Sequence, residues 1–310
     1  MQRKGFPPSA PLPVEAAIAL CALAVVAVEI LVTYSRVPAH ELYHVSGSGL
    51  EGGLSRAVVF ANFPSALVAM AVLGISYERL RYRAVAIVAA ALCAFVFWPG
   101  VVSEANLDAR PVNAAAAIGV LLTCLLVARA PLSSTGRQAG DGARVALAVP
   151  LVLVSLPWFA AELGFFLDGV PLLGRLFETG HYLPDRPGLP PFPPAVHHGH
   201  HHGMDGLILV LSALLLSRAV DSIRGRALRS AVTAYLALML CYGIGNMAND
   251  FWTEQIFKRG WTSWQIPNVL EPRATIAWGI IVVAAAVIWW VSRAVAASRS
   301  RDPGPAVPHG

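Results

Sequence analysis

The chain has 310 residues, of which 56% are hydrophobic and 13% are charged, and its mean hydropathy is +0.61. A water-soluble domain could not cover so apolar a composition with polar surface, so lipid is the expected solvent. The formal net charge is +5. Lys and Arg nevertheless occur in short clusters between apolar runs and form no single basic face, so the chain is not expected to bind nucleic acid.

Apolar runs long enough to cross a bilayer recur about eight times, since a spanning helix needs roughly 20 apolar residues. They predict an all-α integral membrane protein, a bundle of about eight transmembrane helices within a polytopic transmembrane domain, residues 14–298. The third and fourth spans are separated only by Glu104 to Pro111, and losing one of them would make the count odd. The expected spans lie near 14–34, 56–76, 84–103, 112–129, 144–167, 204–222, 228–248 and 273–293.

Three segments are expected outside the spans. Residues 1–13 form a cytoplasmic N-terminal segment, and residues 299–310 form a disordered cytoplasmic tail. Residues 168–203 form a Pro/His-rich extracytoplasmic loop, in which the stretch from Pro184 to Pro194 favours an extended, polyproline-like backbone. This division makes the long loop between the fifth and sixth spans the main non-helical segment of the chain.

The distribution of Lys and Arg between loops predicts the orientation of the bundle. Basic residues of short loops stay on the cytoplasmic side of a membrane, so the Arg-rich loops and both termini should be cytoplasmic. An even number of spans agrees with that, and the expected location is the plasma membrane. The basic residues of this set are Arg3, Lys4, Arg79, Arg81, Arg83, Arg129, Arg137, Arg144, Arg218, Arg224, Arg226, Arg229, Arg293, Arg299 and Arg301.

The first extracytoplasmic loop contains the segment His40-Glu41-Leu42-Tyr43-His44. In a helix, residues four apart share a face, so both imidazoles could hold one zinc ion while the carboxylate activates its bound water. This HExxH pattern resembles the signature of the zincin metalloproteases over five residues. The resemblance implies His40 and His44 as zinc ligands and Glu41 as the catalytic general base of a membrane-bound hydrolase.

A second group of histidines precedes the sixth span, in the segment from His197 to Asp205. Neutral imidazoles at this density bind zinc or copper readily, and His198, His202 and Asp205 would share a face if the helix of the span extended outward. The alternative is a low-complexity loop that takes up metal without a defined site. The sequence leaves both interpretations open.

The predicted orientation brings these two groups to one side of the membrane. Eight of the nine histidines, including His181, fall on the extracytoplasmic side. This bias predicts a shared divalent-metal site for Zn or Cu with the ligand set His40, His44, His181, His198, His202 and Asp205.

Four polar residues within or near the spans are expected to extend this site inward. A charge at the bilayer centre costs at least about 2.5 kcal/mol, so ionisable residues in spans usually mark a pathway or a pair. Glu29 and Glu162 lie in the outer thirds of the first and fifth spans, and Asn246 and Asp250 lie at the outer end of the seventh. The alternative is that each is an interfacial group bonded to a neighbouring helix.

Three classes of function agree with these observations. The first is a multi-pass membrane protein with an extracytoplasmic, His-rich metal site, and the second is a zinc-dependent hydrolase that uses residues 40–44. The third is a non-catalytic membrane subunit or scaffold. The inner halves of the spans are nearly free of acidic residues and histidines, which argues against a conduit for metal ions through the whole membrane.

Overall fold

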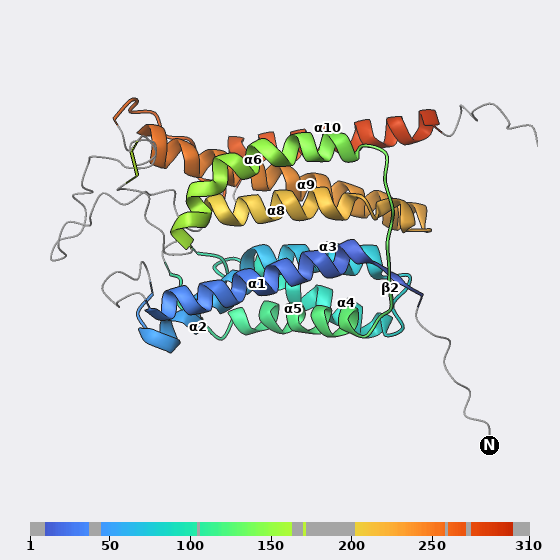
Figure 1. Cartoon of the computed structure of the whole chain (residues 1–310), viewed down its shortest axis with the longest axis horizontal. Coiled ribbons are helices and arrows are strands. Elements are labelled where there is room, and N and C mark those ends of the chain that lie inside the picture. The colour runs from blue at the N-terminus through green and yellow to red at the C-terminus, as the bar shows by residue number, and fades with distance from the viewer. Residues whose placement is uncertain are drawn as a thin grey trace, which may run out of the picture.

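The computed structural model of the chain describes residues 10–36, 45–103, 106–162, 170–171, 202–257, 260–270 and 274–299. These residues contain eight helices that lie roughly along one common axis (Figure 1). The prediction of an all-α fold is therefore confirmed. The helices are α1 (Val14–Arg36), α2 (Gly49–Phe60) continuing through the π-helix η2 (Ala61–Ser65) into α3 (Ala66–Ser76), α4 (Arg83–Ala94) with the 3-10 turn η3 (Phe95–Phe97), α5 (Asn113–Ala128), α6 (Asp141–Glu162), α8 (His202–Ser217), α9 (Arg226–Trp252) with the π-helix η5 (Thr253–Phe257), and α10 (Ile276–Arg299).

Four of these helices are long and apolar enough to cross a membrane. They are Val14–Arg36, Gly49–Ser76, Arg226–Phe257 and Ile276–Val295. Three further apolar helices are shorter and comprise Arg83–Phe97, Asn113–Ala128 and Gly203–Ser217. The chain therefore has the helices of a multi-pass membrane protein, and four of them meet the length of a full span.

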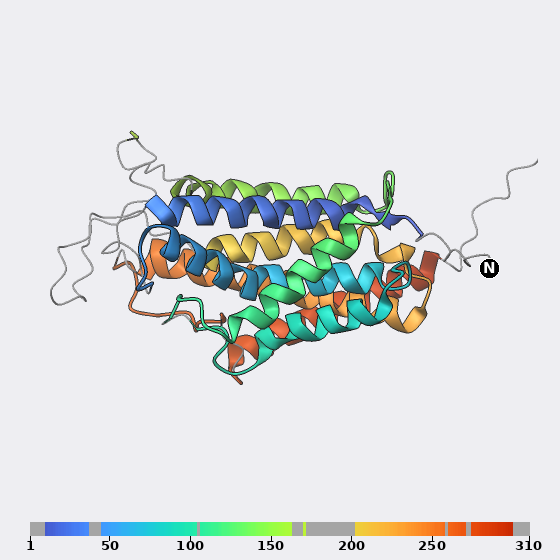
Figure 2. The same cartoon turned by 90° about the horizontal axis from the view of Figure 1, so that it is seen from below.

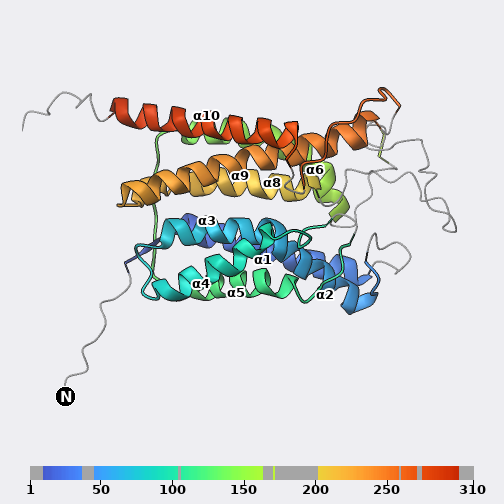
Figure 3. The ribbon, with the colours of Figure 1, turned by 180° about the vertical axis from the view of Figure 1, so that it is seen from behind.

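The helices form two groups that pack against each other. The helices of the first half, α1 to α5, lie together, and α6, α8, α9 and α10 lie beside them (Figures 1 and 3). Figure 2 shows the same bundle from below, with α5 tilted against its neighbours. The main core lies between the groups and contains Phe60, Val68, Val72, Leu209 and Leu216, each almost fully buried. A smaller core surrounds Trp158 of α6.

Glycines permit the closest contacts between helices. A Cβ atom built on Gly206 of α8 would lie 2.6 Å from the carbonyl oxygen of Gly243 in α9, and one on Gly243 would lie 2.6 Å from the carbonyl oxygen of Gly206. A Cβ on Gly203 would collide with the ring of Trp158. Small residues allow such approaches between helices that gain no hydrophobic attraction from their surroundings. The N-terminal turns of α8 are thus held against both α6 and α9.

One end of the bundle is held by an ionic network. The guanidinium of Arg218, which follows α8, contacts Glu15 of α1 at 3.2 Å and Asp141 of α6 at 3.1 Å. Arg144 contacts the other oxygen of Asp141 at 3.0 Å and donates to Ser217 at 2.8 Å. At the same end, the two-residue strands β1 (Leu12–Pro13) and β2 (Leu132–Ser133) pair in parallel. The start of α1, the start of α6 and the end of α8 are joined there.

Glu78 makes a second connection at this end of the bundle. It lies in the turn after α3, and its carboxylate accepts hydrogen bonds from the backbone N–H groups of Arg224 at 2.7 Å and Gly225 at 2.8 Å. These two bonds hold the pKa of the Glu78 carboxyl below its usual range. The neighbouring Arg79 donates to the side chain and the carbonyl of Ser222. The turn after α3 is therefore tied to the turn between α8 and α9.

We predict that Gly206→Ala lowers the thermal stability of the purified protein in detergent, because the added methyl group meets the backbone of α9. Overpacking of this kind typically costs about 1–3 kcal/mol. The matched control is Gly279→Ala in α10, where a Cβ would meet no atom within 4 Å. Alanine favours helix more than glycine does, so the control should be neutral or slightly stabilising. Equal melting temperatures for the two variants would contradict the proposed α8–α9 contact.

Candidate functional site

Most of the predicted metal ligands lie outside the described residues. His40, Glu41 and His44 fall between the end of α1 at Arg36 and the start of α2 at Gly49. His181 and His198 fall in the segment between α6 and α8. The prediction that they share one metal ion therefore stays a prediction. The described residues alone contain no group of three or more His, Cys, Asp or Glu residues that could hold a metal ion.

The remaining two predicted ligands lie at the start of α8. His202 is the first residue of this helix, and Asp205 lies in its first turn. The carboxylate of Asp205 is buried, with 8% of the residue exposed. A negative charge is favourable in the first turn because the free N–H groups give that end of a helix a partial positive charge. The histidine run is therefore followed, within one helical turn, by a buried carboxylate.

Arg56 is a buried cation whose positive charge acts on this carboxylate, and the sequence analysis did not identify it as a site residue. It lies in α2, and only 3% of it is exposed. Its guanidinium also lies 5.7 Å from the centre of the Tyr34 ring in α1. A cation over an aromatic face is attracted to it, more so when both are shielded from water. Side chains from α1, α2 and α8 thus form a buried polar cluster, defined here as Tyr34, Arg56 and Asp205.

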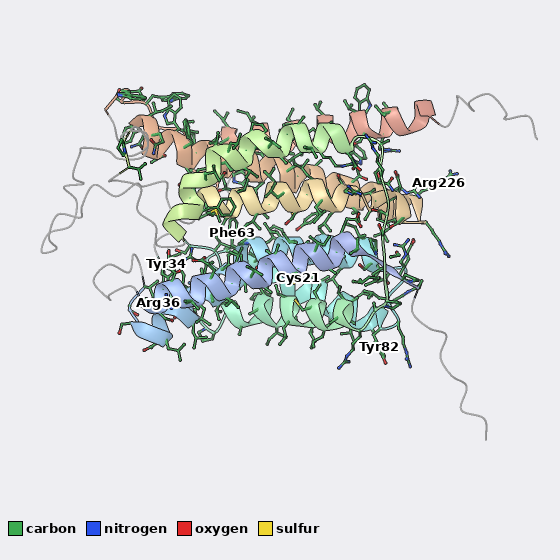
Figure 4. The ribbon with its side chains drawn as sticks, viewed as in Figure 1. Cys21, Tyr34, Arg36, Phe63, Tyr82 and Arg226 are labelled. Atoms are coloured by element: carbon green, nitrogen blue, oxygen red, sulfur yellow. The ribbon has the colours of Figure 1, made fainter. Side chains whose placement is uncertain are left out.

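The local sequence explains how Arg56 reaches this position. A Cβ atom on Gly53 would collide with the Ser35 side chain and with the carbonyl oxygen of Leu31 in α1. Glycine therefore lets α2 lie directly on α1, one turn before Arg56. Figure 4 shows Tyr34 and Arg36 at the end of the bundle opposite Tyr82 and Arg226. The polar cluster consequently lies toward the end opposite the ionic network of Glu15, Asp141 and Arg218.

The predicted polar residues of α9 are buried as well. Asn246 is 1% exposed, and its side chain donates to the carbonyl of Tyr242 at 3.0 Å. Asp250 is 4% exposed. Asn249 donates to the carbonyls of Ile266 and Pro267, at 3.1 and 3.3 Å, and so ties the segment after α9 to the helix. The C-terminal part of α9 is therefore polar on a side that faces protein.

The two predicted carboxylates of α1 and α6 are Glu29 and Glu162, and only the side chain of Glu29 is described. Glu29 is half-buried and accepts a hydrogen bond from Thr33 of its own helix at 2.7 Å. Glu162 ends α6, and its side chain lies outside the described residues. Glu29 thus agrees with the alternative of a locally bonded group, although the described contacts do not test whether it joins a metal site.

A second polar contact, between η2 and α5, lies near the same end. Asn62 donates to the carbonyl of Asn113 at 2.7 Å and to that of Val58 at 2.9 Å. Pro64 lies within η2, where the wider turn removes the need for the N–H group that proline lacks. Farther out, Ser46 donates to the carboxylate of Asp108 through its backbone N–H and its hydroxyl, at 2.9 and 2.8 Å. The segment that follows His44 is thereby fixed to the loop before α5.

Comparisons with protein-family models, with curated proteins and with solved structures found no match for this chain. Inferences about its function therefore rest on the fold and the contacts described above. These provide a buried carboxylate, Asp205, and a buried cation, Arg56, and the carboxylate follows the histidine-rich segment of the sequence.

We predict that Arg56 and Asp205 are energetically coupled. Arg56→Gln and Asp205→Asn should each lower the thermal stability, because each leaves a buried charge without its counter-charge. The double variant should lose less stability than the two single variants lose together, with an interaction energy of about 1 kcal/mol or more. This double-mutant cycle is measured by thermal unfolding in detergent of the unaltered protein, the two single variants and the double variant.

The control for the cycle is Arg137→Gln, since Arg137 lies in the exposed loop at the opposite end of the bundle. Its effect should add to that of Asp205→Asn without interaction. Additive effects of Arg56→Gln and Asp205→Asn would show that the two charges do not form a pair.

Proposed function

We propose that this chain is an eight-span membrane protein with cytoplasmic termini, and that it binds a divalent transition metal, zinc or copper, on its extracytoplasmic side. The observation that carries the metal proposal is the start of α8, where the histidine run ends at His202 and buried Asp205 follows within one turn. The ligands are the imidazoles of the first loop and of the loop before α8. Their number and density suit zinc and copper better than the harder alkaline-earth cations.

The outer surface of the helices supports the membrane part of the proposal. Large apolar side chains are widely exposed on α1, α6 and α10, for example Val25 at 69%, Leu153 at 59% and Ile280 at 64%. Monomeric soluble proteins rarely expose contiguous apolar surfaces of this extent. The shorter helices α4, α5 and α8 would reach across the bilayer with the turns that flank them and with modest local thinning.

The position of Arg56 defines the role that we assign to Asp205. A fixed positive charge beside the carboxylate opposes the approach of a metal cation to the same oxygens. Ligating histidines usually donate their second ring N–H to a carboxylate or carbonyl, which fixes the ring and strengthens the ligand. We therefore assign Asp205 to orient a ligating imidazole, with the charge of Arg56 stabilising the carboxylate and the Tyr34 ring stabilising Arg56.

The test is the metal content of the protein after purification through an affinity tag that contains no histidine. After exposure to buffered zinc or copper, the unaltered chain should retain about one ion, as a defined site requires. The double variant His40→Ala and His44→Ala should lose it, even though residues 197–202 are intact. Asp205→Asn should retain metal with an affinity lowered about 10–100-fold, the usual effect of removing such a partner.

His309→Ala is the matched control, because it removes the one histidine that is expected on the cytoplasmic side. Its metal content should equal that of the unaltered chain. Unchanged stoichiometric metal after loss of His40 and His44 would contradict the joint site. Loose uptake that varies with the number of histidines removed, including His309, would identify an opportunistic loop instead.

A further inference from the structure

The structure contains an apolar cavity of about 170 Å³ between helices of the first group and the helices α9 and α10 of the second. Its walls come from η2, α3, the end of α4, α9, α10 and the segment before α10, and it is partly open to the outside of the bundle. None of the residues of the polar cluster lines it. The lining residues are Phe63, Leu67, Val96, Phe97, Val102, Tyr235, Leu238, Met239, Tyr242, Leu270 and Trp278.

The polar groups of this lining are already used by the protein. The hydroxyl of Tyr235 donates to the carbonyl of Leu67 at 2.9 Å, and that of Tyr242 donates to the carbonyl of Leu270 at 2.6 Å. The indole N–H of Trp278 donates to the carbonyl of Val269 at 3.1 Å. Most ligand pockets keep a few polar groups directed at the ligand. Here these side chains present their rings, so the walls suit a purely hydrocarbon occupant.

The aromatic side chains of the wall also pack against one another. The rings of Phe63 and Tyr242 meet edge to face with centres 5.7 Å apart, and those of Tyr242 and Trp278 lie 5.0 Å apart. Such pairs favour defined geometries. Met239 adds a flexible, polarisable side chain that adapts to irregular apolar shapes.

In the membrane-spanning arrangement proposed above, the position of the cavity along α9 places it within the hydrocarbon layer. Tyr235 and Tyr242 lie nine and sixteen residues after the start of α9 at Arg226, which corresponds to depths of about 14 and 24 Å along the helix. The hydrocarbon core of a bilayer is about 30 Å thick. Phe97 at the edge is 52% exposed, and Ile280 of α10 is 64% exposed. The molecules that meet this opening are therefore lipid chains.

We propose that this cavity is a binding site for a single hydrocarbon chain of a membrane lipid, either an acyl chain or a polyprenyl chain. A dry apolar cavity of roughly 150 Å³ accepts a molecule of the size of benzene, so this one takes a segment of chain of comparable bulk. An empty cavity would forgo the dispersion contacts of its walls, and the chain restores them. The site is separate from the metal proposal and does not depend on the histidines.

Photocrosslinking tests the proposal in reconstituted vesicles of phosphatidylcholine. One preparation contains a small fraction of phosphatidylcholine with a diazirine near the end of one acyl chain, and another contains a diazirine-bearing polyprenol. After illumination, peptide mapping locates the adducts. Adducts should be enriched at residues 235–242 and at Trp278 relative to the outer surface of the bundle. Added unlabelled polyprenol should displace the polyprenol adducts from these residues, whereas contacts on the outer surface will not saturate in this way.

Leu238→Trp fills the cavity from α9 and should lower this labelling several-fold. Leu121→Trp is the matched control, because Leu121 lies on α5, is 59% exposed and does not line the cavity. Val102→Trp fills the cavity from a loop and replaces Leu238→Trp if that variant does not fold. Loss of metal in the His40 and His44 variant should leave the labelling unchanged.

Enrichment with either probe supports a chain-binding site, and the probe with the larger enrichment over the outer surface identifies the lipid class. Labelling of the lining that does not exceed that of the outer surface, with both probes, would overturn the proposal. So would enriched labelling that Leu238→Trp and Val102→Trp leave intact.

Discussion

The cost of placing charge in a hydrocarbon layer constrains every ionisable side chain of this protein. Most of the charged groups described above lie at an end of the bundle or interact with an opposite charge, and Glu29 within α1 accepts a hydrogen bond from Thr33. At one end, Arg218 joins Glu15 and Asp141, and Glu78 receives two backbone N–H groups. Toward the other end, the charge of Arg56 acts on Asp205. The pairing of charges therefore also fixes which helices are neighbours.

Glycine contacts make these pairings geometrically accessible. Gly53 brings α2 onto α1, so that Arg56 lies over the Tyr34 ring, and Gly206 brings α8 onto α9 directly after Asp205. Each polar group of the cluster thus lies within one turn of a close helix contact. In a lipid surrounding, where burial of apolar surface gives little attraction between helices, such packing and polar contacts supply the specificity. At the aromatic cavity, by contrast, η2, α3, α9 and α10 leave space between their side chains.

The sequence predicted the all-α fold because an apolar run of about 20 residues is a strong signal. It also identified Asp205, Asn246 and Asp250 as polar groups near the outer ends of helices, and all three are buried. It did not identify Arg56, because an arginine at the edge of an apolar run resembles an interfacial anchor. Only the packing of α2 on α1 shows that it is buried. Ion pairs between residues that are far apart in the chain, such as Glu15 and Arg218, leave no local pattern in the sequence.

The most direct test of the membrane account is the accessibility of single cysteines in a chain whose four native cysteines are replaced by alanine. Ser134 lies in the exposed loop before α6, and Ser263 lies in the exposed segment after α9. With a membrane-impermeant maleimide and intact bacterial cells whose outer envelope is permeabilised, Ser263→Cys should be labelled, and Ser134→Cys should be labelled only after lysis. Labelling of Ser134→Cys in intact cells, or protection of Ser263→Cys, would contradict the proposed eight-span topology.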